Sequence, residues 1–159
     1  MSTVSLLAAI REHPFVAEFR PEHVDKLGAM AREVRFAAGQ TIFSEGDDCH
    51  DFYLIVAGRV ALEIEEPDHL LRVQTLSAGD EFGWSAVLMG RRKHFKARAL
   101  EAVEALAFDG PALLDACRAD TGFGFALMAR MLGVVAERLQ ATRLQLHDMY
   151  SPVAKRSGT

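Results

Sequence analysis

The residues best suited to chemistry in this chain of 159 residues lie between positions 79 and 93. A glycine-rich stretch, Gly79-Asp80-Glu81-Phe82-Gly83-Trp84-Ser85-Ala86, is followed by the cationic run Arg91-Arg92-Lys93. Glycine lets the backbone approach a ligand closely, and a short helical turn starting near Ser85 would aim unpaired backbone N–H groups at that ligand. Together with the positive charges, these features favour an anion such as a phosphate. The alternative for so short a motif is a glycine turn followed by a solvated charge run.

Composition indicates one globular domain over residues 1–159. Half of the residues are apolar and a quarter are charged, enough for one domain with a core. The formal charge of −4 gives no overall attraction to nucleic acid or to an anionic membrane, so an anion site must be local. Cys49 and Cys117 are far apart and match no metal or redox motif. The apolar opening lacks the basic start and cleavage site of a signal peptide, and no later stretch approaches a membrane span. We therefore expect a cytoplasmic protein without a membrane partner.

Three segments and a tail must position the candidate site. Helical spacing occurs over residues 3–12 and 21–33, and glycine-punctuated strands of four to eight residues follow. The predicted parts are N-terminal helices over 1–33, a β-roll over 34–109, C-terminal helices over 110–150 and a polar tail over 151–159. The predicted fold class is α+β: an antiparallel β-roll (a double-stranded β-helix or jelly roll) flanked by the N-terminal helices and a long C-terminal dimerisation helix.

One hairpin is expected within the roll. Residues 52–57 and 60–65 both alternate between two faces, and Gly58-Arg59 separates them as a turn. We therefore expect these two strands to pair with each other.

The last predicted helix carries an apolar stripe with alternating spacings of four and three residues. Its members are Met128, Leu132, Val135, Leu139, Thr142, Leu146 and Met149. This spacing keeps one seam facing a partner helix and predicts a parallel homodimer. The alternative is that the stripe packs against the protein's own barrel. A helix from Gly122 to Tyr150 would be roughly 40 Å long, too long for so small a domain to cover, which favours the dimer.

The order of these features resembles the cyclic nucleotide-binding domain of the catabolite activator protein family. The resemblance covers nearly the whole chain. It rests on the helices at both ends and on four glycine-punctuated stretches between them: Glu45-Gly46-Asp47, Phe52-Tyr53-Leu54-Ile55, Gly58-Arg59-Val60 and Gly79-Asp80-Glu81-Phe82-Gly83. The resemblance implies a ligand, cyclic AMP or cyclic GMP, and no other cofactor.

The resemblance also implies a phosphate-binding cassette, and this chain departs from the family's pattern there. The family reads Phe-Gly-Glu, whose glutamate holds the ribose, followed some ten residues on by an arginine that holds the cyclic phosphate. Phe82 and Gly83 are kept, Trp84 replaces the glutamate, and the aligned cation is Lys93. A shift of one residue in the loop would instead bring Arg91 or Arg92 to the phosphate. Trp84 has two interpretations, stacking on a ligand ring or filling the ligand's cavity.

Two residues of the long helix complete the predicted site. The stretch Arg138-Leu139-Gln140-Ala141-Thr142-Arg143 is similar to the part of the family's central helix that reaches the adenine of bound cyclic AMP. Thr142 and Arg143 would close a pocket that also includes Gly83, Trp84, Ser85, Ala86 and the cations of the 91–93 run. The alternatives are a tolerated polar seam residue at Thr142, and at Arg143 a pairing with Glu137 or Asp148 that needs no ligand.

The expected function is that of a stand-alone, homodimeric sensor or regulatory domain for a small anionic ligand. The chain ends soon after Tyr150, where family members continue into a helix-turn-helix domain, so we expect no direct contact with nucleic acid and an unknown protein partner. No catalytic residue or metal site is expected, because the histidines are dispersed and no nucleophile motif occurs. The alternative function is a degenerate, ligand-free dimeric interaction scaffold.

Overall fold

The helical spacing at the start of the chain gives two helices joined by a short turn. The computed structural model describes residues 3–48, 50–88 and 95–157. Helix α1 spans Thr3–Glu12, the 3-10 turn η1 spans Pro14–Val16, and α2 spans Pro21–Met30. A proline occupies the first turn of both η1 and α2, where its missing N–H costs no hydrogen bond. Helix α2 ends earlier than the spacing predicts, because Ala31 is already extended.

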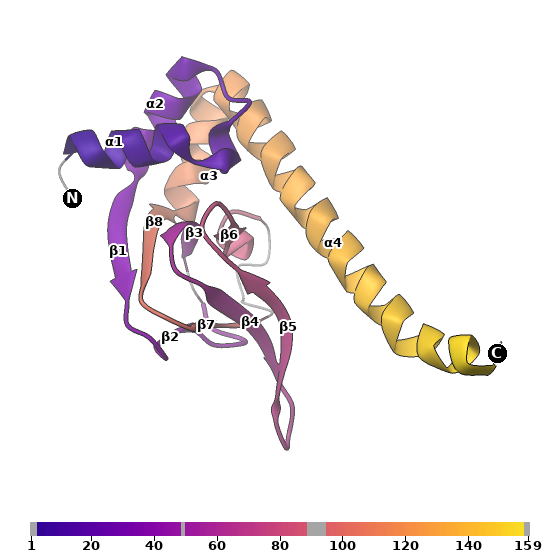
Figure 1. Cartoon of the computed structure of the whole chain (residues 1–159). Helices are drawn as coiled ribbons and strands as arrows, with labels where there is room; N and C mark the ends of the chain where they lie inside the picture. The colour runs from indigo at the N-terminus through magenta and orange to yellow at the C-terminus, as the bar shows by residue number, and fades with distance from the viewer. Residues whose placement is uncertain (1–2, 49, 89–94, 158–159) are drawn as a thin grey trace. The chain divides into compact units, whose positions relative to one another are not determined.

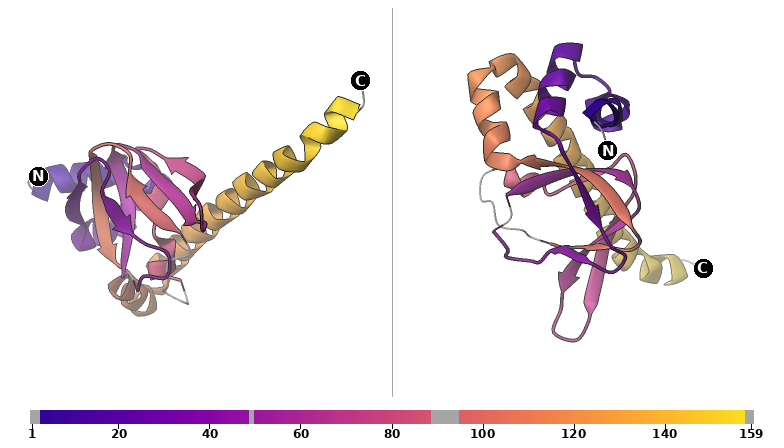
Figure 2. Two further views of the ribbon diagram at one scale, coloured as in Figure 1. Left: turned by 90° about the horizontal axis from the view of Figure 1, so that it is seen from below. Right: turned by 90° about the vertical axis from the view of Figure 1, so that its left-hand side faces the viewer.

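Within the residues that the structure describes, eight strands form two four-stranded antiparallel sheets (Figures 1 and 2). Their bounds are β1 Arg32–Phe36, β2 Thr41–Phe43, β3 Asp51–Ala57, β4 Val60–Glu65, β5 Leu70–Leu76, β6 Glu81–Phe82, β7 Lys96–Ala99 and β8 Val103–Asp109. The strand order is β1-β8-β3-β6 in one sheet and β2-β7-β4-β5 in the other. The strands of each sheet are therefore drawn from both halves of the roll segment, which confirms the predicted jelly-roll fold.

The expected hairpin between residues 52–57 and 60–65 is wrong. Strand β3 pairs with β6 and β8, whereas β4 pairs with β5 and β7 in the other sheet. Gly58, between β3 and β4, has a φ of 93°, and a Cβ there would lie 2.3 Å from the carbonyl oxygen of Ala102. The tight glycine turn thus carries the chain from one sheet to the other. The alternation identified both strands correctly but carried no information about their partners.

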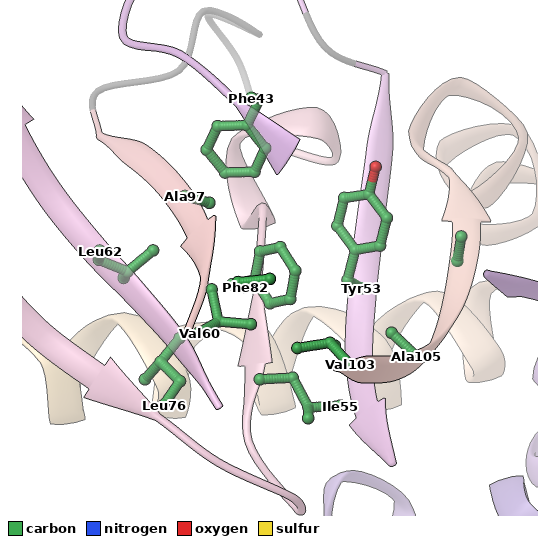
Figure 3. Close-up of a cluster of buried hydrophobic side chains, with 12 residues drawn as sticks. Phe43, Tyr53, Ile55, Val60, Leu62, Leu76, Phe82, Ala97, Val103 and Ala105 are labelled. Carbon is green, nitrogen blue, oxygen red and sulfur yellow. The ribbon is translucent and has the colours of Figure 1, made fainter. Parts of the chain in front are cut away.

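Side chains from both sheets fill the interior of the roll (Figure 3). The rings of Tyr53 and Phe82 stack at a centroid distance of 4.7 Å and an interplanar angle of 14°. Phe43 packs on Phe82 and Phe36 packs on Tyr53, with centroid distances of 6.0 Å and 5.9 Å. Burying such rings is the largest single source of stability in a small core, so this cluster joins the two sheets.

The chain divides into two compact units, Met1–Leu127 and Met128–Thr159. The first unit contains the roll and α3, Gly110–Ala119, and the second consists of most of α4, Thr121–Ser157. Helix α4 continues through part of the expected polar tail as far as Ser157. The assignment of residues 1–159 to one domain stays a prediction.

Three leucines of the expected seam are exposed in the second unit, as is Leu144, which lies outside the stripe. The side chains of Leu132, Leu139 and Leu146 are 70%, 69% and 50% exposed, at intervals of seven residues. Among the described helices, none has the length and apolar character needed to cross a membrane.

Candidate functional site

The backbone of the candidate cassette is a single tight turn capped by glycine. Gly83 has φ 83° and ψ 21°, a left-handed conformation that glycine adopts without strain. The 3-10 turn η2, Trp84–Ala86, follows directly, and the backbone N–H of Ala86 donates to the carbonyl of Gly83 at 3.0 Å. The short helical turn expected near Ser85 is therefore confirmed, and it begins at Trp84.

Strand β3 holds the approach to this turn. Phe82 pairs in register with Tyr53. Just upstream, the backbone N–H of Ile55 donates to the carbonyl of Asp80 at 2.9 Å, and the N–H of Gly79 donates to the carbonyl of Ile55 at 3.0 Å. The glycine stretch is thus bound to a buried strand before it reaches the cassette.

The start of α3 holds the far side of the turn. A Cβ at Gly110 would lie 2.1 Å from the carbonyl oxygen of Ala86, so the two backbones meet without an intervening side chain. The N–H of Gly110 donates to the carbonyl of His50 at 2.7 Å. Asp109 caps α3, because its carboxylate accepts from the N–H of Ala112 at 3.0 Å. The cassette is therefore fixed against the end of β8 and the first turn of α3.

His13 links the N-terminal helices to the same region, a role that the sequence did not indicate. Its Nδ1 accepts from the N–H of Phe15 at 3.1 Å, which places the proton of the neutral ring on Nε2. Nε2 then donates to the carbonyl of Ile55 at 2.9 Å, the carbonyl that also accepts from Gly79. The available signal was a histidine directly before Pro14, since a capping side chain precedes a helix-starting proline.

The predicted cassette residues differ in exposure. Ser85 and Ala86 are 8% and 1% exposed, so both are buried, whereas Trp84 is only partly buried. A partly buried indole agrees with stacking on a ligand and with partial filling of its cavity. The predicted cations Arg91, Arg92 and Lys93 lie outside the described residues.

Two buried carboxylates of the roll lie outside its aromatic interior. Glu81 is 6% exposed and precedes Phe82, whose ring belongs to the interior cluster, so the pleat directs Glu81 to the opposite face. Glu63 alternates in the same way with Leu62 and accepts two hydrogen bonds from Arg98, at 2.9 Å and 2.8 Å. These hydrogen bonds hold the pKa of Glu63 below its ordinary value.

Thr142 and Arg143 belong to the second unit, separate from the unit that contains the cassette. Both side chains are exposed, and the Thr142 hydroxyl donates to the carbonyl of Arg138 in its own helix at 3.0 Å. Glu137 pairs with Arg130 at 3.9 Å rather than with Arg143.

Within residues 3–48, 50–88 and 95–157, no group of three or more His, Cys, Asp or Glu side chains could hold a metal ion.

Helices precede and follow the jelly roll, and the glycine-capped turn lies against the start of α3, so the class of fold is an α+β domain built on an antiparallel β-roll. The family profile described as the cyclic nucleotide-binding domain matches residues 33–120. The chain belongs to this family.

Relatives with known roles match parts of the chain. The CRP-like cAMP-activated global transcriptional regulator of Mycobacterium tuberculosis is 26% identical over 130 residues, which cover 81% of this chain and 56% of the regulator. The cAMP/cGMP-dependent 3',5'-cAMP/cGMP phosphodiesterase B of Dictyostelium discoideum is 33% identical over 75 residues, which cover 47% of this chain and 7% of the enzyme. The chain thus spans about half the length of the regulator and a small part of the phosphodiesterase.

A solved structure supports the fold. The catabolite activator protein of Thermus thermophilus superposes with a TM-score of 0.71 at 24% identity, covering 86% of this chain and 62% of that protein. This similarity confirms the predicted resemblance to the catabolite activator protein fold.

Proposed function

We propose that the chain is a sensor or regulatory domain that binds a cyclic nucleotide or a related anionic small molecule through a modified cassette. The observation that carries the proposal is the family match over residues 33–120, which includes the glycine-capped turn at Gly83. The relatives named as cAMP-activated and cAMP/cGMP-dependent proteins support a cyclic nucleotide as the ligand. The role is regulatory rather than catalytic, and its output passes to a protein partner.

The modified cassette predicts weakened recognition of the ribose. Trp84 offers an indole N–H donor where the family's carboxylate is a charged acceptor. Losing a hydrogen bond to a charged group costs about 1.5 to 3 kcal/mol, which is roughly a ten- to hundredfold loss of affinity. Lys93 supplies a point charge to the phosphate but not the two-pronged contact of arginine. We expect binding of cyclic AMP or cyclic GMP in the micromolar range.

We also propose that the chain forms a parallel homodimer through α4. The exposed leucines Leu132, Leu139 and Leu146 support this dimer, because burying the part of each side chain that is still exposed contributes roughly 1 to 2 kcal/mol each. A Leu139→Glu variant places charges in the centre of the seam and should be monomeric in sedimentation experiments. A Gln140→Glu variant adds the same charge at the neighbouring position outside the stripe and should remain dimeric.

Isothermal titration with cyclic AMP and cyclic GMP tests the ligand. Wild type is compared with Lys93→Ala, which removes the aligned cation, and with Trp84→Glu, which restores the family's carboxylate. Micromolar binding that is lost in Lys93→Ala would support the proposal. Absence of wild-type binding would refute the cyclic nucleotide as ligand.

The second candidate, a ligand-free interaction scaffold, is supported by the filled aromatic interior of the roll, to which Phe82, two residues before Trp84, belongs. It predicts that the emission of Trp84, the only tryptophan of the chain, is blue-shifted and unchanged by nucleotide. It also predicts that Trp84→Glu gains the affinity that wild type lacks.

A further inference from the structure

The two ring nitrogens of His13 contact different parts of the first unit of the chain. Nδ1 accepts from the N–H of Phe15 and so caps η1. Nε2 donates to the carbonyl of Ile55 on β3, at a distance of 2.9 Å and across 42 positions of sequence. The side chain is 5% exposed, so solvent offers little to replace either bond. One nitrogen therefore holds a local turn, and the other holds that turn to a strand of the roll.

The carbonyl of Ile55 is shared between His13 and the glycine stretch. It also accepts from the N–H of Gly79 at 3.0 Å, and these two donors use both lone pairs of the carbonyl oxygen. The N–H of Ile55 donates to the carbonyl of Asp80 at 2.9 Å. The backbone of Ile55 thus holds two successive residues of the glycine stretch, and the His13 side chain holds the same backbone from the other side.

Pro14 adds a packing contact to this hydrogen bond. Gly79 has a φ of 93°, and a Cβ there would lie 3.2 Å from Cγ of Pro14. Glycine therefore serves both the backbone conformation and the close approach of the proline ring. The N-terminal segment holds the turn at Gly79 through two neighbouring residues, His13 and Pro14.

A very short strand connects this turn to the cassette. Strand β6 is only two residues long, Glu81 and Phe82, and among the described strands it pairs with β3. Because two paired residues fix a strand weakly, the position of β6 depends on the hydrogen bonds of Ile55 just before it. Both residues of β6 are buried, at 6% and 0% exposure, so no solvated loop separates Gly79 from Gly83. A displacement at Gly79 is therefore transmitted to the cassette.

We propose that the Nε2 donor of His13 positions the cassette for its ligand, and that the docking of the N-terminal helices and the binding of the ligand strengthen each other. The inference rests on the proposed function, because it concerns the same cassette. His13 acts through Ile55 and Gly79 and does not itself contact the ligand. The coupling is reciprocal, since a contact that favours ligand binding is favoured equally by the bound ligand.

Two substitutions separate the roles of the two nitrogens. His13→Asn places a carboxamide oxygen near the position of Nδ1, which keeps the cap on η1 and removes the donor to Ile55. His13→Gln places an amide N–H near the position of Nε2, which keeps the donor and removes the cap. Each variant loses one hydrogen bond, so both should lower the urea midpoint of unfolding to a similar extent. The control Val24→Ala, at a buried position of α2, should also lower the midpoint but leaves both contacts of His13 in place.

Isothermal titration with cyclic AMP and amide hydrogen exchange at Ala86 are the two readouts. The N–H of Ala86 donates to the carbonyl of Gly83, so its exchange rate reports the order of the cassette without any ligand. His13→Asn should bind roughly fivefold more weakly than wild type, the effect of about one net hydrogen bond, and should exchange faster at Ala86. His13→Gln and Val24→Ala should bind within about twofold of wild type and should exchange at the wild-type rate at Ala86.

The outcomes distinguish this inference from the proposed function. If the two His13 variants change the exchange at Ala86 equally, or if neither changes it, the positioning role is overturned whatever the wild type binds. Wild-type affinity for cyclic AMP in His13→Asn overturns the coupling to the ligand. A wild type that binds no cyclic AMP, together with faster exchange in His13→Asn alone, supports the positioning of the cassette and refutes the cyclic nucleotide as its ligand.

Discussion

Gly110 is the position where a single methyl group should disturb the cassette. A Cβ added there would lie 2.1 Å from the carbonyl oxygen of Ala86 and 2.6 Å from its carbonyl carbon. Both atoms are backbone, so no side-chain rotation relieves the contact, and either η2 or the first turn of α3 must move. Forcing an extra methyl group into a packed site costs about 1 to 3 kcal/mol. Alanine ordinarily stabilises a helix relative to glycine by roughly 0.5 to 1 kcal/mol, and here the contact should reverse that sign.

The assay combines urea unfolding with the emission of Trp84, the first residue of η2 and the only tryptophan. We expect Gly110→Ala to lower the free energy of unfolding by about 1 to 3 kcal/mol and to shift the native emission maximum. The control is Gly122→Ala near the start of α4, where the nearest atom to a new Cβ is Asp120 Oδ1 at an ordinary 3.5 Å. The control should be neutral or stabilising, with unchanged emission. A Gly110→Ala protein as stable as the control, with the wild-type emission, would refute the close contact between η2 and α3.

Three further changes test the framework of the roll and its connections. Arg98→Ala leaves Glu63, which is 2% exposed, without its two hydrogen bonds from Arg98, and should lower the free energy of unfolding by about 3 kcal/mol in thermal or urea unfolding. The control Arg118→Ala removes one partner of an exposed ion pair and should change the free energy of unfolding by less than about 1 kcal/mol. Because those hydrogen bonds lower the pKa of Glu63, the stability that the pair contributes is complete above pH 4.5 and is lost as pH falls through the folded-state pKa. The difference in free energy of unfolding between wild type and Arg98→Ala, measured in urea from pH 7 to pH 3, should therefore be largest at neutral pH and shrink in acid. A difference that grew in acid would contradict this. His13→Phe keeps a buried ring but removes the hydrogen bonds to Phe15 and Ile55. This variant should lower the free energy of unfolding by about 2 kcal/mol and raise the rate of amide hydrogen exchange at Gly79. An unchanged exchange rate would argue against the link between His13 and the strand that holds Gly79.

Local sequence patterns predicted where the strands lie but not which strands pair. Alternation in residues 52–57 and 60–65 reports which side chains share a face, and both strands were found. The choice of pairing partner depends on strands that are far away in sequence, such as β8 for β3. The turn at Gly58 was also found, but a turn residue with positive φ serves a hairpin and a crossover between sheets equally well.

The candidate site likewise contains features that a local pattern predicts and contacts that it does not. The turn at Gly83 was predictable because glycines that interrupt a strand pattern mark turns, and the structure gives this residue a left-handed backbone conformation. The contact between Gly110 and Ala86 joins residues 24 positions apart in sequence and leaves no local pattern. The same holds for the hydrogen bond from His13 to Ile55, which spans 42 positions. These contacts are tertiary, and a single sequence gives their residues no distinctive spacing.

The contacts around the cassette distinguish the residues that hold its backbone in place from the side chains that would contact a ligand. Phe82, Gly83 and Gly110 hold the turn in place through packing, backbone conformation and close approach, and none of them presents a charge. The geometry of the turn is therefore held by residues that need no ligand. We therefore expect the choice of ligand to depend on Trp84 and on the cations after it in sequence. Changing Trp84 should alter affinity while leaving the roll folded, whereas changing Gly110 should alter the fold of the turn itself. Comparing the two variants by titration and by unfolding distinguishes a lost ligand contact from a lost scaffold.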